Sequence, residues 1–210
     1  TRRARDTRIS GGVARADAGL IAIGLGADVT VFDTNVQRLR QLDDHFEGRV
    51  HTAASNPFDL DRAVVESDLV IGSVLIPGAR APKLVTNEMV SRMRPGSVLV
   101  DIAVDQGGCF ADTHPTTHAD PTFMVHGSVF YCVANMPGAV PNTSTSALTN
   151  ATLPYVRAIA RDGWRAALTA DPALALGLNT SAGAVINTGV AAAHGLAAGS
   201  LAAALAGVLG

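Results

Sequence analysis

The sequence has few cysteines, few charged residues and no strongly basic or acidic balance. Two cysteines in 210 residues exclude a disulfide scaffold and indicate a reducing compartment, so we expect a cytoplasmic protein. Charged residues make up 16% and hydrophobic residues 48%, which excludes a disordered polyelectrolyte. The net charge of -2 argues against a nucleic-acid partner, because nucleic-acid-binding proteins usually carry a basic face.

Signals for targeting, membrane insertion and metal binding are also missing. No apolar stretch follows the arginine-rich residues 1–8, so we expect no signal peptide. The tail, Val190–Gly210, is long enough for a span but is mostly alanine and glycine, which favours a packed or frayed terminal helix over a membrane helix. The six histidines show no metal-ligand spacing, and no signature marks Cys109 as a nucleophile. We therefore expect no metal and a buried, inert thiol.

Short β-rich runs alternate with helical patterns, which is typical of βαβ units and a parallel sheet. Two continuous apolar runs, Leu69–Val74 and Ser97–Ala103, predict strands that are covered on both faces. Further strands are expected at residues 27–32, 49–53, 122–125 and 129–133, and helices at residues 35–46, 60–67 and 87–92. The sequence therefore predicts an α/β fold.

The pattern becomes helical in the last third of the chain. Thr143–Thr169 predicts one long helix that is broken or bent near Pro154. Asp171 and Pro172 predict the N-cap and first residue of a second helix, and the remainder is expected to be alanine-rich helix.

This change of pattern predicts a domain boundary near residue 141. We expect an α/β domain over residues 1–140 and a helical segment over residues 141–210. The helical segment has apolar residues on too many faces to stand alone, so we expect it to pack on something.

A glycine-rich stretch, Ser10–Arg15, precedes a helical pattern and is the first candidate for ligand binding. In dinucleotide-binding folds this turn reads G-x-G-x-x-G, and its glycines let the backbone approach the pyrophosphate. Here only Gly12 keeps its place, because Ser10 and Arg15 fill the other two positions. Residues 3–9, which should form the central first strand, are largely polar. We expect both strand and turn to be degraded, and the residues alone leave a plain turn and a phosphate loop equally open.

Acidic residues after predicted strands are further candidates. Asp33 lies about 20 residues after the glycines, where a carboxylate binds the ribose of NAD. The alternative is an exposed strand-end or helix-capping aspartate, with Asn35 competing for the cap. Ligands of open parallel sheets bind outside the carboxyl ends of strands, as in the loops at residues 74–78, 102–108 and 135–138. Asp105 is the only acid in its loop, although a turn aspartate would look the same.

Several longer motifs resemble L-alanine dehydrogenase. They are GADVTVFD (26–33), DLVIGSVLIPGARAPK (68–83), VDIAVDQGGC (100–109), PTTH (115–118) and YCVANMPGAVPNTSTSALTNATLPY (131–155). The last motif separates this family from its relative, the NAD-binding part of proton-translocating transhydrogenase. The resemblance implies a Rossmann-like doubly wound NAD-binding domain, followed by a C-terminal helical segment of the substrate domain. It also implies oxidative deamination of L-alanine to pyruvate and ammonium with NAD, usually by a homohexamer.

The resemblance also implies roles for individual residues. By the family's pattern, Val13 and Ala14 lie in the pyrophosphate turn and Asp33 binds the adenosine ribose. Arg38 lies near the adenosine and Ser55 near the adenine. Residues expected to line the cofactor groove and the nicotinamide side are Val74, Leu75, Ile102, Ala103, Val104, Asp105, Val133, Ala134, Asn135 and Met136. Asp105 becomes the catalytic candidate, as a group that orients water or substrate near the reacting centre.

The sequence also departs from the family. The family's substrate arginine, catalytic lysine and catalytic histidine lie in an N-terminal half that these residues do not include, and Lys83 belongs to the cofactor-domain loop. His114 stands where some relatives carry an arginine. We therefore expect a C-terminal piece that is catalytically dead, or nearly so, in isolation. The alternatives are a non-catalytic nucleotide-binding module, a transhydrogenase-like NAD-binding domain, or a destabilised relic that has lost a central strand.

Overall fold

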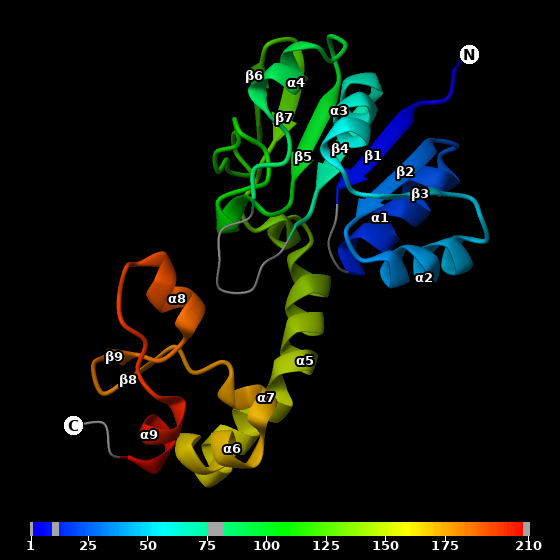
Figure 1. Cartoon of the computed structure of the whole chain (residues 1–210). Coiled ribbons are helices and arrows are strands. Elements are labelled where there is room, and N and C mark those ends of the chain that lie inside the picture. The colour runs from blue at the N-terminus through cyan, green and yellow to red at the C-terminus, as the bar shows by residue number, and fades with distance from the viewer. Residues whose placement is uncertain (1, 10–12, 75–81, 208–210) are drawn as a thin grey trace. The chain divides into compact units, whose positions relative to one another are not determined.

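A computed structural model describes residues 2–9, 13–74 and 82–207, except for the side chains of residues 13–17 (Figure 1). Within this part the chain divides into two compact units, one that extends to Met136 and one that begins at Pro137. The boundary expected between residues 140 and 141 falls at the start of the long helix α5, Pro141–Asp162.

The first unit is built on a seven-stranded sheet with the order β3-β2-β1-β4-β5-β7-β6. The strands are β1 (Arg5–Ile9), β2 (Asp28–Asp33), β3 (His51–Ala54), β4 (Leu69–Gly72), β5 (Val98–Asp101), β6 (Thr122–Val125) and β7 (Ser128–Tyr131). Neighbouring strands are parallel except in the antiparallel pair β6–β7. The winding reverses direction between β1 and β4, which makes this the topological switch point. The expected α/β fold with a Rossmann-like doubly wound sheet is confirmed.

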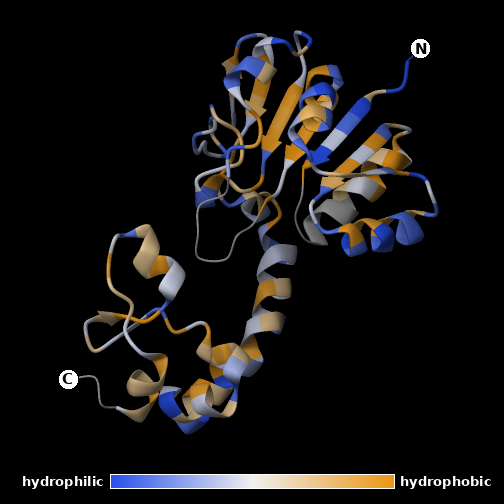
Figure 2. Cartoon of the chain, viewed as in Figure 1, coloured by the Kyte–Doolittle hydropathy of each residue, from blue (hydrophilic) through white to orange (hydrophobic). Residues whose placement is uncertain are grey.

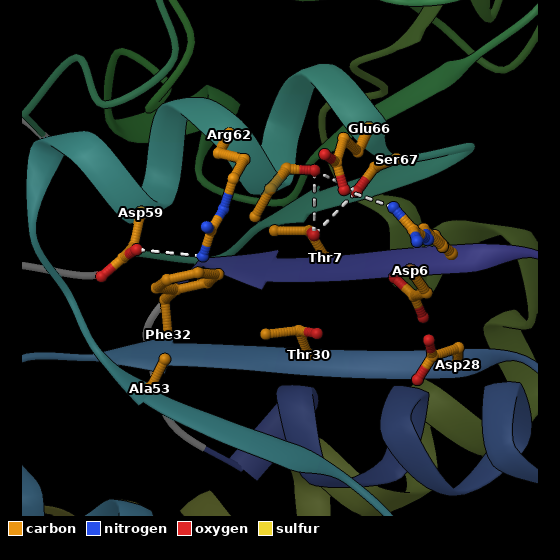
Figure 3. Close-up of a pocket in the computed structure, with 12 residues that line it drawn as sticks. Asp6, Thr7, Asp28, Thr30, Phe32, Ala53, Asp59, Arg62, Glu66 and Ser67 are labelled. Atoms are coloured by element: carbon orange, nitrogen blue, oxygen red, sulfur yellow. Dashed lines mark hydrogen bonds and ion pairs between the residues drawn. The ribbon is translucent and has the colours of Figure 1, made fainter.

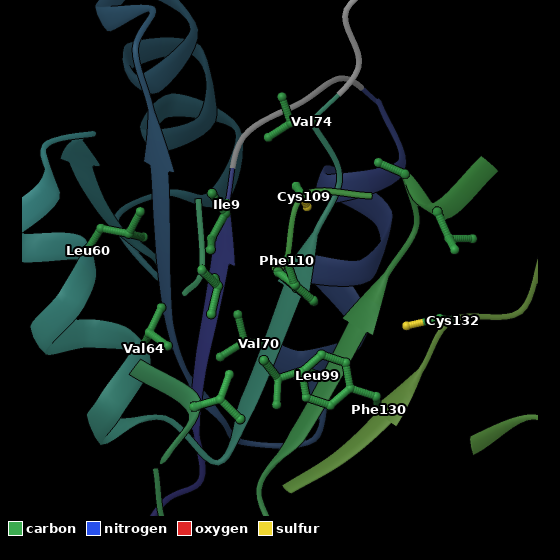
Figure 4. Close-up of a cluster of buried hydrophobic side chains, with 14 of the residues drawn as sticks. Ile9, Leu60, Val64, Val70, Val74, Leu99, Cys109, Phe110, Phe130 and Cys132 are labelled. Carbon is green, nitrogen blue, oxygen red and sulfur yellow. The ribbon is translucent and has the colours of Figure 1, made fainter. Parts of the chain in front are cut away.

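Helices pack on both faces of the sheet. Successive side chains of a strand point to opposite faces, so Val29 and Val31 pack with α1 and α2, whereas Phe32 packs with α3. The larger core lies on the second side and extends to β4, β5 and β7, where Val70, Leu99 and Phe130 are buried (Figure 4). The helices are α1 (Val13–Gly24), α2 (Val36–Phe46), α3 (Pro57–Glu66) and α4 (Asn87–Ser91).

Strand β1 forms although its sequence is polar. Figure 2 shows it largely in hydrophilic colours, unlike the hydrophobic β5. Its backbone pairs in parallel with both β2 and β4, and this pairing does not depend on the side chains. Asp6 and Arg8 are both buried and form an ion pair with each other. The expectation of a lost central strand is therefore wrong, because the backbone of β1 is paired on both sides. The glycine turn itself lies outside the described residues.

The long helix of the second unit ends differently from the sequence prediction. Helix α5 continues through Pro154, and the break comes at Gly163, after which α6 (Trp164–Ala170) begins. Gly163 has φ 78° and ψ 154°, a backbone conformation that residues other than glycine rarely adopt. The predicted break of the helix at Pro154 is therefore wrong. The expected cap at Asp171 is confirmed, because its carboxylate accepts hydrogen bonds from two backbone N–H groups of the next turn.

The remainder of the second unit is not one alanine-rich helix. It consists of α7 (Pro172–Ala175), the hairpin β8 (Thr180–Ser181) and β9 (Ala184–Val185), α8 (Thr188–Ala193) and α9 (Leu201–Ala206). Gly183 and Gly195 both have positive φ, and they place turns where a continuous helix was expected. Within the described ranges, no helix combines the length and hydropathy needed to cross a membrane.

Candidate functional site

The carboxyl ends of β1, β2, β4 and β5 lie at one edge of the sheet, hereafter the carboxyl edge, because these strands are parallel (Figure 1). Open α/β sheets bind ligands at this edge, next to the switch point between β1 and β4. Val13 and Ala14 begin helix α1 there, directly after the glycine turn. Residues 10–12 and 75–81, and therefore the predicted Leu75, lie outside the described residues.

Asp33 is the last residue of β2 and is 6% exposed. Its Oδ1 accepts a hydrogen bond from the backbone N–H of Asn35 at 2.8 Å. The side chain of Asn35 caps α2 by accepting from the N–H of Arg38 at 3.1 Å. Asn35 therefore takes the capping role that the sequence left open, and Asp33 is neither the cap nor an exposed strand end. Its carboxylate lies at the carboxyl edge.

Two further predicted residues lie near Asp33 in the fold. Ser55 follows β3, and its backbone N–H donates to the carbonyl oxygen of Asp33 at 2.9 Å, so these two residues are direct neighbours. Arg38 lies in the first turn of α2, and its guanidinium donates to Gln41 Oε1 at 3.2 Å. The structure thus brings Ser55 to Asp33 and places Arg38 on the helix that begins beside it.

The loop after β5 contains four predicted residues. The N–H of Ile102 donates to the carbonyl that ends β4, at 2.8 Å, so the loop leaves the sheet beside β4. Ala103 and Val104 are buried in the same cluster as Val74. Asp105 is exposed on the short 3-10 helix η1, Val104–Gln106. The structure therefore brings the predicted residues after β4 and β5 together and leaves the carboxylate of Asp105 open to solvent.

The predicted residues after β7, Val133–Met136, are held by the segment that contains the PTTH motif. Val133 is buried and forms a parallel bridge with Thr116. The backbone of Asn135 has φ 60°, and its carbonyl oxygen lies 3.0 Å from Nε2 of His118. Met136 begins a second 3-10 helix, Met136–Ala139.

Two charged residues at the carboxyl edge were not assigned a role from the sequence. Asp101 is fully buried at the end of β5, and Lys83 contacts the loop that follows it. The available signal for Asp101 was an acid inside the apolar run VLVDIA, since a buried charge needs hydrogen-bonding partners. No sequence signal indicates which backbone groups Lys83 contacts.

Cys109 is buried in the hydrophobic cluster (Figure 4). Its thiol lies 3.5 Å from Oδ1 of Asp101. Burial, together with the nearby Asp101 carboxylate, raises the pKa of the Cys109 thiol far above its ordinary value. The thiol therefore stays protonated, as expected of an inert cysteine. Across the described parts of the chain, no three His, Cys, Asp or Glu side chains gather in a way that could hold a metal ion.

A separate groove of about 450 Å³ lies over the face of β1, β2 and β3 beside α3 (Figure 3). Thr7, Thr30 and Phe32 form part of its floor, and charged side chains surround them, among them Asp59 and Arg62, which form an ion pair at 3.2 Å. None of the residues predicted to bind a ligand lines this groove, so it is distinct from the carboxyl edge.

Comparisons with known proteins decide the family. The family model for the C-terminal domain of alanine dehydrogenase/PNT matches residues 1–188. The chain belongs to this family. It is 58% identical over 183 residues to the alanine dehydrogenase of Mycolicibacterium smegmatis, a match that covers 87% of the chain and 49% of that protein. The chain thus spans about half the length of the curated relatives it matches.

Solved structures agree with the assignment to the alanine dehydrogenase/PNT family. An L-alanine dehydrogenase matches with a TM-score of 0.81 and 49% sequence identity, covering 91% of the chain and 53% of that protein. A transhydrogenase from Sinorhizobium meliloti matches with a TM-score of 0.59 and 29% identity, covering 67% of the chain and 40% of that protein. The predicted resemblance to L-alanine dehydrogenase is confirmed.

Proposed function

We propose that this chain is the NAD-binding half of an alanine dehydrogenase and that it binds NAD at the carboxyl edge. The observation that carries the proposal is Asp33, a carboxylate at the end of β2, in a doubly wound sheet of this family. A carboxylate at this position accepts hydrogen bonds from ribose hydroxyls and disfavours a 2′-phosphate. The proposed cofactor is therefore NAD and not NADP.

The other residues at the carboxyl edge fit a dinucleotide. Helix α1 follows β1, and the free N–H groups of a helix N-terminus are a suitable setting for a pyrophosphate. Ser55 and Arg38 would lie on the adenosine side with Asp33. The nicotinamide side would be formed by residues after β4, β5 and β7, namely Val74, Ile102, Ala103, Val104, Asp105, Val133, Ala134, Asn135 and Met136.

The bound nicotinamide would supply the hydride acceptor for oxidation of the substrate. Asp105 is the proposed catalytic residue of this half. Its exposed carboxylate would orient water or substrate and would stabilise the cationic imine of the substrate that water attacks. The groups that bind the substrate carboxylate and move protons in the family are not among these residues, so we propose that the chain alone does not turn over L-alanine.

The complete protein would convert L-alanine to pyruvate and ammonium in amino-acid catabolism. Its proposed location is the cytoplasm and its proposed assembly a homohexamer. These three proposals are supported by the likeness to alanine dehydrogenases over about half of their length.

The test is isothermal titration calorimetry of the 210-residue chain with NAD and, separately, with adenosine. We expect NAD to bind clearly more tightly, and Asp33→Asn to weaken NAD binding about tenfold, which corresponds to ~1.4 kcal/mol. Asp44→Asn, an exposed aspartate on α2, is the matched control and should leave affinity unchanged. Equal affinity for NAD and adenosine, or no binding of either, would contradict the proposal. Steady NADH production from L-alanine by the chain alone would contradict the proposal that this half does not turn over L-alanine by itself.

A further inference from the structure

The carboxylate of Asp101 gathers the two ends of the loop that carries Asp105. Its Oδ1 accepts a hydrogen bond from the N–H of Ala103 at 3.1 Å. Its Oδ2 accepts from the N–H groups of Cys109 at 2.9 Å and Phe110 at 3.3 Å. Asp101 is 0% exposed, so these bonds satisfy a charge that has no access to water. The loop at residues 102–110 is thus closed around one buried carboxylate.

Lys83, the only lysine of the sequence, holds the same loop through its carbonyl groups. Its Nζ donates to the carbonyl oxygen of Gly107 at 2.6 Å and to that of Phe110 at 2.8 Å. The N–H of the next residue, Leu84, donates to the carbonyl oxygen of Cys109 at 2.8 Å. The loop is therefore fixed in two ways. The Asp101 carboxylate accepts hydrogen bonds from its N–H groups, and the Lys83 ammonium donates hydrogen bonds to its carbonyl groups.

The packing inside the loop leaves little freedom. Gly108 has φ +70°, and a Cβ atom there would lie 1.9 Å from Cγ2 of Thr113 and 2.6 Å from Oδ2 of Asp101. Cys109 and Phe110 belong to the buried cluster that includes Leu99 (Figure 4). The inner side of the loop is thus held by burial and charge, whereas Asp105 on its outer side is exposed.

We propose that Asp101 and Lys83 are positioning residues that hold the loop at residues 102–110 so that Ile102–Asp105 meet the nicotinamide end of the cofactor. This inference rests on the proposed binding of NAD at the carboxyl edge. Neither side chain is required to touch the cofactor. They act through the loop, whose fixed arrangement removes the cost of ordering it when a ligand binds.

The experiment compares NAD with ADP-ribose, which lacks the nicotinamide, in titrations of the wild-type chain and of Lys83→Met and Asp101→Asn. We expect the wild type to prefer NAD. In both variants the ratio of the affinity for NAD to the affinity for ADP-ribose should fall about tenfold. The affinity for ADP-ribose itself should stay within about twofold of the wild-type value. Lys83→Arg should retain the wild-type preference, because the guanidinium keeps a positive charge and several N–H donors.

The matched control is Arg94→Met, which removes a cation that ties backbone at the opposite end of the strands. Arg94 donates to the carbonyl of Glu66 at 3.1 Å and to Asp68 Oδ1 at 3.2 Å, and its loss should not change the preference for NAD. A second readout reports on the loop itself. In the Lys83→Met variant, the rate at which a thiol reagent labels Cys109 should increase relative to the rate at Cys132. Both thiols are buried, and only Cys109 lies in the loop.

The outcomes separate this inference from the proposed function. A variant that labels faster at Cys109 but keeps the wild-type preference for NAD over ADP-ribose would overturn the positioning role. Equal losses of affinity for NAD and ADP-ribose, with a lower melting temperature, would also overturn it in favour of a purely structural role. A wild-type chain that binds NAD no more tightly than ADP-ribose would overturn the proposed nicotinamide site itself, and the positioning role with it.

Discussion

Asp6 and Arg8 form an ion pair inside the central strand β1, with exposed fractions of 2% and 1%. Nη2 of Arg8 donates to Oδ2 of Asp6. Among the polar atoms that the structure describes, Asp6 Oδ1, Arg8 Nε and Arg8 Nη1 have no hydrogen-bond partner. Each unpaired buried polar atom costs about 1–3 kcal/mol, so the three together cost roughly 3–9 kcal/mol before the attraction within the pair is counted.

Replacement of both residues by valine should stabilise the protein. Asp6 pairs in register with Val29 of β2 and Arg8 with Val31, so two valines would extend an existing apolar surface. Buried ion pairs replaced by packed hydrophobic residues typically gain about 1–4 kcal/mol. The single variant Arg8→Val leaves the Asp6 carboxylate buried without its cation and should lose about 3–5 kcal/mol.

The assay is equilibrium unfolding in urea, followed by circular dichroism, for the wild type, both single variants and the double variant. We expect the double variant to unfold at a higher urea concentration than the wild type, and Arg8→Val at a lower one. A double variant less stable than the wild type would refute the reasoning, because it would mean that the ion pair stabilises β1 more than packed valines do.

The same pair predicts a pH dependence. Burial raises the pKa of Asp6 above its ordinary value of 3.8, although the Arg8 guanidinium acts in the opposite direction. The folded chain therefore binds this proton more tightly than the unfolded chain. The resulting stabilisation is fully present below pH 3.8 and is lost as the pH rises through the raised pKa. The unfolding free energy of the wild type relative to Asp6→Asn should fall over this range, and a difference independent of pH would contradict the assignment.

Two further predictions concern the carboxyl edge. Gly108→Ala should lower the unfolding free energy by more than about 2 kcal/mol, because its Cβ would collide with Thr113 at a positive φ, and thermal unfolding should show no comparable loss for Gly24→Ala, which has open space around it. Asp33→Ser should raise the affinity for NADP relative to NAD, because the carboxylate no longer repels a 2′-phosphate. An unchanged ratio of the two affinities in calorimetry would contradict the ribose role of Asp33.

Much of the sheet could be predicted because its strands carry their signal in the side chains. The apolar runs at Leu69–Val74 and Ser97–Ala103 predicted strands that are covered on both faces of the sheet, and each run contains an observed strand. Strand β1 carries no such signal, because its side chains are largely polar, and its backbone pairing with β2 and β4 places it in the sheet. The helix predicted over Thr143–Thr169 was expected to break or bend near Pro154, but α5 continues through this proline and the break comes at Gly163.

The position of a candidate residue was predictable where that residue directly follows a clear strand signal. Asp33 could be selected by its spacing from the glycines, and Ser55 lies beside it in the fold. Asp101 and Lys83 could not be selected in this way. Their contacts are backbone groups up to 27 positions away in sequence, and only the folded loop brings those groups together.

The central claim is that NAD binds at the carboxyl edge, and an NMR titration of the isotopically labelled chain tests it most directly. We predict that NAD shifts the backbone amide signals of Asp33, Ser55 and Ile102–Asp105. The signals of Thr30 and Arg62, which line the groove on the face of the sheet, should stay in place. Shifts confined to that groove, or no shifts at saturating NAD, would contradict the account.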